Sequence, residues 1–306
     1  MNWRNEITNA AVRSEGHTVR TPVLTFDGFG LGYPIEMKLE QMQCTGSFKA
    51  RGAFNTLLSS DVPETGLVAA SGGNHGAAVA YAAKKLGHKA KIFVPEFAGP
   101  AKIGLIKRSG ADLSVVMGEY ANAFQDAQAY ETEKGAMQVH AFDAISTVAG
   151  QGTLTREWEE QGLQADTILI AVGGGGLIAG AMAWLGKTRK ILAVEPEKAP
   201  TMFTALAQGG PQDVEVGGIA ANALGARKVG QICYDLAIET GTECVTVTDE
   251  AIRTAQVALW QECRQLVEPA GATALAALMS GAYKPAPDER VAVLVCGGNL
   301  SEDPFG

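Results

Sequence analysis

The sequence predicts an α/β fold with mostly parallel sheets flanked by helices, and three observations lead to it. Short apolar segments alternate with helix-like segments, which is typical of βα units. The chain has 306 residues, about twice the roughly 150 residues of a typical domain, so we expect two lobes or one large unit. Glycine accounts for 37 of the 306 residues, and glycine pairs follow three of the apolar segments, which predicts tight turns and close backbone approach to a ligand.

The predicted elements follow one another along the chain. Seven apolar segments are predicted to be buried strands, at residues 35–39, 67–70, 90–95, 113–117, 167–172, 190–195 and 291–296. Six helices are predicted at residues 73–86, 100–109, 121–134, 149–161, 249–266 and 269–280. Residues 167–186 are uncharged and long enough to span a membrane, but the four glycines within them favour a strand, a turn and a helix.

Charge and cysteine content exclude several classes of function. The net charge is -8, without a basic stripe, so neither nucleic acid nor a membrane is an expected partner. Five cysteines without a CxxC pair argue against a disulfide framework and a zinc site. The first residues carry charges where a signal peptide would be apolar. We therefore predict a cytoplasmic protein.

The run Gly173, Gly174, Gly175, Gly176 follows a predicted strand and begins a predicted helix. Backbone N–H groups at such a position cradle an anion. Two alternatives remain open at this point. The glycines could merely allow a helix to pack closely on a strand. Alternatively, Gly174, Gly176 and Ala179, with Glu195 nineteen residues after Gly176, match a dinucleotide-binding pattern that predicts NAD.

A second motif, TGSFKARGA, spans residues 45–53. Ser47 is predicted to cap a helix, which places Lys49 in its first turn. The positive end of the helix dipole there favours the neutral, nucleophilic amine. The alternative is an ordinary solvated lysine on the surface.

Two further motifs stand at predicted strand ends. SGGNHG, residues 71–76, places Ser71, Asn74 and His75 at a turn whose N–H groups suit a carboxylate, although His75 could instead be a helix cap or a core histidine. Cys296 ends the last predicted strand, before Gly-Gly-Asn. It could be a small buried apolar residue or a hydrogen-bond partner for a ring nitrogen.

Together with VEPAGA at 267–272 and CGGN at 296–299, these motifs resemble the fold type II pyridoxal-phosphate enzymes, above all the serine/threonine dehydratases and serine racemases. The resemblance implies a two-lobed fold. Residues 1–56 and 145–306 would form a large cofactor-binding domain, and residues 57–144 a small domain that closes over the substrate. It also implies a homodimer.

The resemblance implies pyridoxal 5'-phosphate as the cofactor and a role for each motif. It assigns Lys49 to the covalent link with the cofactor, Phe48 to one face of its ring, Asn74 to its phenolic oxygen, Gly173 to Gly176 to its phosphate, Cys296 to its ring nitrogen, Glu268 to the ring's surroundings, and Ser71, Asn74 and His75 to the substrate carboxylate. An NAD enzyme would leave Lys49, SGGNHG and CGGN unexplained, so that alternative is set aside.

The implied activity is α,β-elimination, in which L-serine, L-threonine or a related β-hydroxy amino acid becomes a 2-keto acid and ammonia. The alternatives are an amino-acid racemase, a β-replacement enzyme and a noncatalytic small-molecule binding protein. In racemases of this family, a serine that serves as the second acid/base occupies the position of Gly72. We therefore expect weak or absent racemisation.

Two further expectations follow from the resemblance. Glu195 and a carbonyl near Ala199 could bind the divalent or monovalent cation of some relatives, but Thr201 stands where a second carboxylate is expected, which puts cation dependence in doubt. The chain ends about where the catalytic unit does, so we expect no C-terminal regulatory domain and no feedback inhibition by isoleucine.

Overall fold

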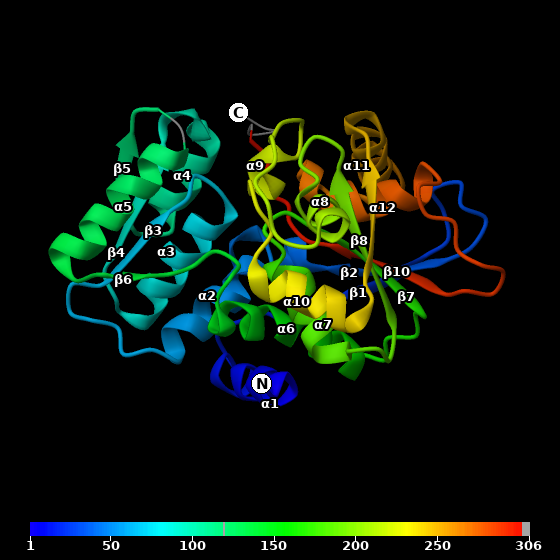
Figure 1. The fold of residues 1–306 in the computed structure, drawn as a ribbon, viewed down its shortest axis with the longest axis horizontal. Coiled ribbons are helices and arrows are strands. Elements are labelled where there is room, and N and C mark those ends of the chain that lie inside the picture. Colours follow the sequence, from blue (N-terminus) through cyan, green and yellow to red (C-terminus); the bar gives the residue numbers. More distant parts are fainter. Residues whose placement is uncertain (119, 302–306) are drawn as a thin grey trace.

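Two separate β-sheets organise the chain (Figure 1). The computed structural model describes residues 1–118 and 120–301. The larger sheet has the strand order β1-β2-β10-β7-β8-β9, and the smaller sheet has the order β5-β4-β3-β6. The strands are β1 (Val23–Phe26), β2 (Ile35–Leu39), β3 (Leu67–Ala70), β4 (Ala90–Pro95), β5 (Asp112–Val116), β6 (Met137–Gln138), β7 (Thr167–Ala171), β8 (Lys190–Pro196), β9 (Glu243–Val247) and β10 (Val291–Val295).

The predicted α/β class with mostly parallel sheets is confirmed. Only β1 pairs antiparallel with its neighbour among the described strands, and the other described pairs are parallel. The seven predicted strands are all present, each within one residue of its predicted ends. β7 and β10 are buried along their whole length, as expected for parallel strands that helices cover on both faces.

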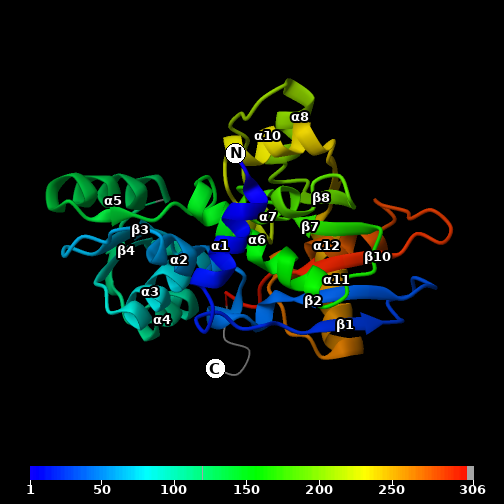
Figure 2. The same ribbon diagram turned by 90° about the horizontal axis from the view of Figure 1, so that it is seen from below.

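Helices cover both faces of the larger sheet. α11 and α12 pack on one face, while α6 and α7 lie on the other, with α1 outside them (Figures 1 and 2). The helices are α1 (Trp3–Arg13), α2 (Lys49–Leu58), α3 (Asn74–Leu86), α4 (Pro100–Arg108), α5 (Tyr120–Lys134), α6 (Ile145–Glu160), α7 (Gly176–Leu185), α8 (Thr201–Gln208), α9 (Ala221–Leu224), α10 (Gln231–Thr240), α11 (Asp249–Cys263) and α12 (Pro269–Met279). All six predicted helices are present, although α6 begins four residues earlier than expected.

The smaller sheet has a separate core on each face. Leu67 and Ala69 of β3 pack with α3, whereas Val68 and Ala70 pack on the side of α5. This follows from the alternation of side chains along a strand. α3 and α4 therefore lie on one face and α5 on the other, as the view from below shows (Figure 2).

The motif-bearing loops leave the carboxyl ends of three strands. SGGNHG follows β3, the glycine run follows β7, and Cys296 follows β10. The loop before α2 joins them, because Ser47 forms a β-bridge with Gly297 and the N–H of Phe48 donates to the carbonyl of Cys296. Ligands of open α/β sheets bind at such strand ends. No helix in the described part of the chain is long and apolar enough to cross a membrane.

Candidate active site

One cavity brings most of the predicted site residues together. Its lining comes from residues 48–49, 74, 142, 171, 173–177, 223–224, 268, 270 and 296. Phe48, Lys49, Asn74, the four glycines, Glu268 and Cys296 are therefore neighbours. Ser71 and His75 belong to the same loop as Asn74 but are not part of this lining.

Lys49 is the first residue of α2, as expected for a lysine in the first helical turn. The predicted cap is wrong by one residue, because the N-cap is Phe48 and the buried Ser47 hydroxyl has no hydrogen-bond partner in the described structure. Lys49 Nζ donates to the carbonyl of Ala141 at 2.7 Å and lies 5.1 Å from the centre of the Phe48 ring. Burial lowers the pKa of the Lys49 ammonium to about 8, so more of the amine is neutral than in an ordinary lysine.

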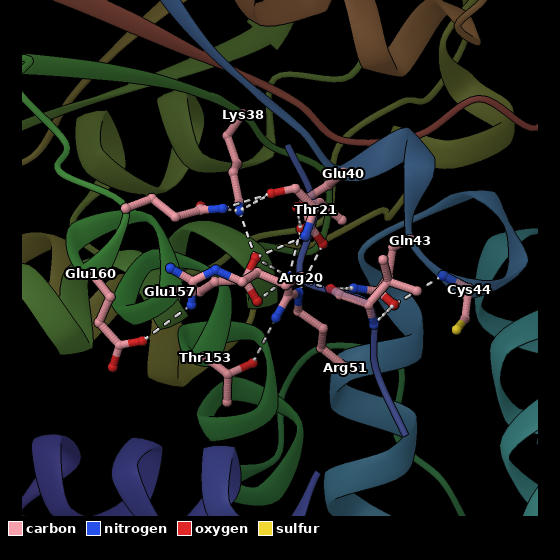
Figure 3. Close-up of polar contacts among 12 residues, drawn as sticks. Arg20, Thr21, Lys38, Glu40, Gln43, Cys44, Arg51, Thr153, Glu157 and Glu160 are labelled. Carbon is pink, nitrogen blue, oxygen red and sulfur yellow. Dashed lines mark hydrogen bonds and ion pairs between the residues drawn. The ribbon is translucent and has the colours of Figure 1, made fainter. Parts of the chain in front are cut away.

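A buried ionic network anchors α2 (Figure 3). Arg51, two residues after Lys49, donates to both carboxylate oxygens of Glu40 at 2.9 and 2.7 Å. It also donates to both oxygens of Glu157 at 3.0 Å, and Lys38 donates to Glu157 at 2.6 Å. The two cations balance the two anions. Paired in this way, the charges tie the lysine-bearing helix to the end of β2 and to α6.

The glycine run forms the turn between β7 and α7. Gly175, the N-cap of α7, has a φ of 88°, which glycine adopts without strain. A Cβ on Gly175 would also stand 2.5 Å from Cys233 Sγ, and one on Gly174 would overlap the ring of Phe142. No side chain caps α7 in the described structure, so the N–H groups of its first turn can bind an anion. The packing and anion-cradle interpretations are thus compatible.

Asn74 is held between two other side chains. Its Nδ2 donates to Glu268 at 2.5 Å, and its Oδ1 accepts from Asn299 Nδ2 at 2.8 Å. Burial raises the pKa of Glu268 to about 7, although the hydrogen bond from Asn74 and the charge of Lys102 oppose that rise. The amide of Asn74 therefore has a fixed orientation at the edge of the cavity.

Ser71 and His75 make local contacts. The Ser71 hydroxyl accepts from the N–H of Gly73 at 3.2 Å. His75 Nε2 lies 2.8 Å from the carbonyl of Val139, so this nitrogen carries the proton. Burial and the charge of Lys49 lower the pKa of His75 to about 3. The ring is therefore uncharged at neutral pH. In this respect His75 resembles a buried core histidine, which was one of the alternatives considered for it in the sequence.

Cys296 presents a neutral sulfur to the cavity. The side chain is 3% exposed, and its thiol donates to the carbonyl of Ala270 at 3.4 Å. Burial raises the pKa of the thiol, and the carboxylate of Glu268 adds to the effect. A thiol in this state does not supply the negative charge that a carboxylate would.

The sequence analysis missed several residues that complete the cavity. Phe142 lies in the loop before α6, and no local pattern marked it. Ala223 and Leu224 come from the glycine-rich region 209–230, for which no role was predicted. That region packs on the glycine turn, because the N–H of Gly230 donates to the carbonyl of Gly174 at 3.0 Å. Asn299 is the last residue of the CGGN motif, and its place in that motif was the one feature of the sequence that could have marked it.

Glu195, which was predicted to meet a ribose hydroxyl or a cation, has several hydrogen-bond donors of the protein around its carboxylate. Its carboxylate accepts from the hydroxyl of Thr201 at 2.8 Å and from the N–H groups of Met202 and Phe203 at 2.8 and 2.9 Å. The Cys244 thiol lies 3.5 Å away. These donors engage the carboxylate at the start of α8. No group of three or more potential metal ligands of the His, Cys, Asp and Glu types occurs within residues 1–118 and 120–301.

Comparisons with known proteins identify the family of the chain. The family described as "Pyridoxal-phosphate dependent enzyme" matches residues 15–297. Phenylserine dehydratase of Ralstonia pickettii is 38% identical over 282 residues, which cover 90% of this chain and 85% of that protein. L-threonine ammonia-lyase of Thermotoga maritima is 33% identical, over 88% of this chain and 68% of that one. The structure of maize serine racemase is 30% identical and superposes with a TM-score of 0.92, covering 97% and 93% of the two chains.

Proposed function

The chain belongs to the pyridoxal-phosphate-dependent enzymes, and from this we propose that it is an ammonia-lyase acting on β-hydroxy amino acids. The substrate is L-serine, L-threonine or a related compound. The products are the 2-keto acid and ammonia, by α,β-elimination followed by hydrolysis. Phenylserine dehydratase and L-threonine ammonia-lyase among the relatives support this reaction class. The observation that carries the proposal is the amine of Lys49, the lysine among the residues that line the cavity, together with the uncapped helix N-terminus in the same lining.

The residues fit pyridoxal 5'-phosphate. The uncapped N-terminus of α7 suits a phosphate, and the glycines at 173–176 let it approach the backbone. With a pKa of about 8, about one tenth of the Lys49 amine is neutral at pH 7, compared with about one in 3,000 for an ordinary lysine. When bound, the cofactor supplies an aldehyde that captures amines and a ring that accepts electrons from the substrate Cα.

We assign the cofactor contacts to the residues that the sequence predicted. Gly173 to Gly176 hold the phosphate through their N–H groups, and Phe48 covers one face of the ring. Asn74 offers its amide to the phenolic oxygen, supported by its bonds to Glu268 and Asn299. Cys296 meets the ring nitrogen as a neutral group, which burial of its thiol supports.

Lys49 is the proposed catalytic residue. With the cofactor bound, Lys49 would hold it, and in its free form the Lys49 amine would take the proton from the substrate Cα. Its low pKa supports this role, because a base must be neutral to accept a proton. Loss of the β-hydroxyl together with a proton, as water, would complete the elimination.

The substrate carboxylate is assigned to the loop of Ser71, Asn74 and His75. The N-terminus of α3 lies in this loop and carries no side-chain cap in the described structure. The ring of His75 is neutral and already donates to Val139. We therefore assign the contribution of His75 to its backbone N–H rather than to its ring.

Racemisation is the second candidate, because maize serine racemase is a close structural match. Gly72 supports elimination over racemisation. A Cβ on Gly72 would stand 2.5 Å from the Cβ of Ala98 and 3.2 Å from Val94, so this position faces β4 and the turn after it rather than the residues that line the cavity. A glycine there also has no side chain to donate a proton.

We further propose that residues 57–144 close as a small domain over a large domain of residues 1–56 and 145–306. All four strands of the smaller sheet lie between residues 67 and 138, which supports these limits. A homodimer is proposed, consistent with the exposed Val257 and Trp260 one turn apart on α11. A cytoplasmic location is proposed because the five cysteines are all free thiols.

The test is a panel of amino acids with purified, cofactor-loaded protein. L-serine, L-threonine, 3-phenylserine and L-alanine are assayed for ammonia and keto acid, and D-serine formation is measured by chiral chromatography. We expect equal amounts of ammonia and keto acid from at least one β-hydroxy amino acid, and none from L-alanine. Lys49→Ala should abolish turnover, whereas exposed Lys107→Ala should not. Full activity of Lys49→Ala, or D-serine as the main product, would refute the proposal.

A further inference from the structure

Lys102 is a buried cation for which the site described above has no use. It lies on α4, and its exposed fraction is only 3%. Within the described part of the chain its ammonium makes no hydrogen bond and no ion pair. The Nζ atom itself is not among the fully enclosed polar atoms that lack a partner in the described structure. It therefore borders open space, and an ammonium without a protein partner at such a position points to an anionic ligand.

The ammonium faces the start of α3. Its Nζ lies 3.9 Å from the point that a Cβ on Gly73 would occupy. Gly73 is the N-cap of α3, a helix of 13 residues that no side chain caps in the described structure. The first-turn N–H groups of a helix lack intrahelical acceptors and attract anions. Two independent sources of positive potential, one a side chain and one a helix end, therefore face the same point.

Glu268 faces this point from the larger sheet. It is the N-cap of α12, and its carboxylate is engaged by Asn74. Its charge opposes the effect of burial, which lowers the pKa of Lys102. Even so, the two groups form no ion pair within 4.0 Å in the described structure. Since the ring of His75 is neutral and bonded to Val139, Lys102 is the charged group placed to meet an anion at this loop.

We propose that Lys102 is a substrate-binding residue whose ammonium, together with the N-terminus of α3, pairs with the carboxylate of the amino-acid substrate. This assignment rests on the proposed function, which supplies an amino acid as the ligand. It makes Lys102 a specificity determinant, because the ammonium increases the affinity for a carboxylate but adds little to the affinity for a neutral amide.

Binding is measured with the cofactor-loaded protein and two ligands, L-alanine and L-alaninamide, from the change in the visible absorbance of the cofactor. Neither ligand carries a β-leaving group, so binding is read without elimination. We expect Lys102→Met to weaken L-alanine binding by about 10-fold to 100-fold, the effect of losing a hydrogen bond between charged groups. L-alaninamide binding should change by less than about threefold, so the preference for the acid over the amide collapses.

Two further variants complete the design. Lys102→Arg keeps the charge and should keep most of the preference for the acid. Lys107→Met removes an exposed lysine from the same helix and should change neither affinity. Lys102→Gln replaces Lys102→Met if the latter does not fold.

The outcomes separate the two hypotheses. An equal loss of affinity for acid and amide in Lys102→Met would show that Lys102 supports Glu268 or the fold, and would overturn the assignment alone. If the cofactor-loaded wild-type protein bound neither ligand, the proposed function and the assignment would fall together. A selective loss for the acid that Lys102→Arg restores would establish the assignment.

Discussion

Replacing Arg51 by methionine tests whether the ionic network under α2 holds the lysine-bearing helix in place. The variant removes four bonds to the carboxylates of Glu40 and Glu157. Glu157 keeps its bond from Lys38 at 2.6 Å and the one from the N–H of Thr21 at 3.0 Å. Glu40 is fully buried and keeps only the hydroxyl of Thr21. The change therefore leaves one buried carboxylate without a counter-charge (Figure 3).

Removing one partner from a buried pair costs about 3–5 kcal/mol of the free energy of unfolding, so we expect a loss of that size in Arg51→Met. Arg156 is the control. It pairs with Glu160 on α6, where the two side chains are 27% and 46% exposed, and removal of such a surface pair costs less than about 1 kcal/mol. In the double variant Arg51→Met/Glu40→Leu both charges are gone, and we expect it to be more stable than Arg51→Met alone.

Urea unfolding followed by tryptophan fluorescence provides the assay. Trp158 is 1% exposed and adjoins Glu157 on α6, so it reports on the region that the network joins. Because two lobes can unfold in separate steps, each transition is fitted by itself. The reasoning would be refuted if Arg51→Met lost no more stability than Arg156→Met, or if the double variant were less stable than the single one.

Three further predictions concern the site. In the cofactor-free protein, the rate at which an amine reagent labels Lys49 should rise with pH and level off above about 8, because only the neutral amine reacts; peptide mass spectrometry would show ordinary lysines still gaining reactivity near pH 10. Gly175→Ala should weaken cofactor retention by at least about tenfold, because its φ of 88° and the Cys233 sulfur oppose a side chain. Gly210→Ala, at a glycine without a positive φ and with nothing within 4 Å of its added Cβ, serves as the control in an absorbance titration. Removal of divalent cations with a chelator should leave turnover unchanged, since Glu195 is already engaged by protein donors; a loss that magnesium restores would contradict this.

The sequence predicted the interior of each sheet better than its edges. The three strands that the sequence analysis missed, β1, β6 and β9, each lie at the edge of a sheet. β9 is partly exposed along most of its length, and β6 has only two residues. The continuous apolar run that marks a buried parallel strand is therefore missing there. Pairing with an inner strand gives these segments their conformation, and that pairing depends on residues far away in the sequence.

The candidate site divides in the same way. Residues inside short motifs, such as Lys49 and Asn74, could be identified because a local pattern carries them. Phe142, which lines the cavity, and Lys102, whose Nζ approaches Gly73, could not be, since each is placed by the packing of a loop or helix whose own sequence is ordinary. The helix cap was misassigned because Ser47 takes an extended conformation and bridges Gly297 instead of capping α2. A contact with a distant strand thus overrode a local preference.

Burial, rather than ion pairing, controls the charge on most groups around the cavity. It lowers the pKa of Lys49 and His75 and raises that of Cys296. Neutral side chains attract an anion only weakly. The uncapped N-termini of α3 and α7 therefore become the main sources of positive potential around the cavity. Under the proposed function, these two helix ends would meet two anionic groups, the phosphate of the cofactor at α7 and the carboxylate of the substrate at α3. A helix end acting alone at α3 would bind any small anion. The proposed role of Lys102 beside it would increase the selectivity for a carboxylate.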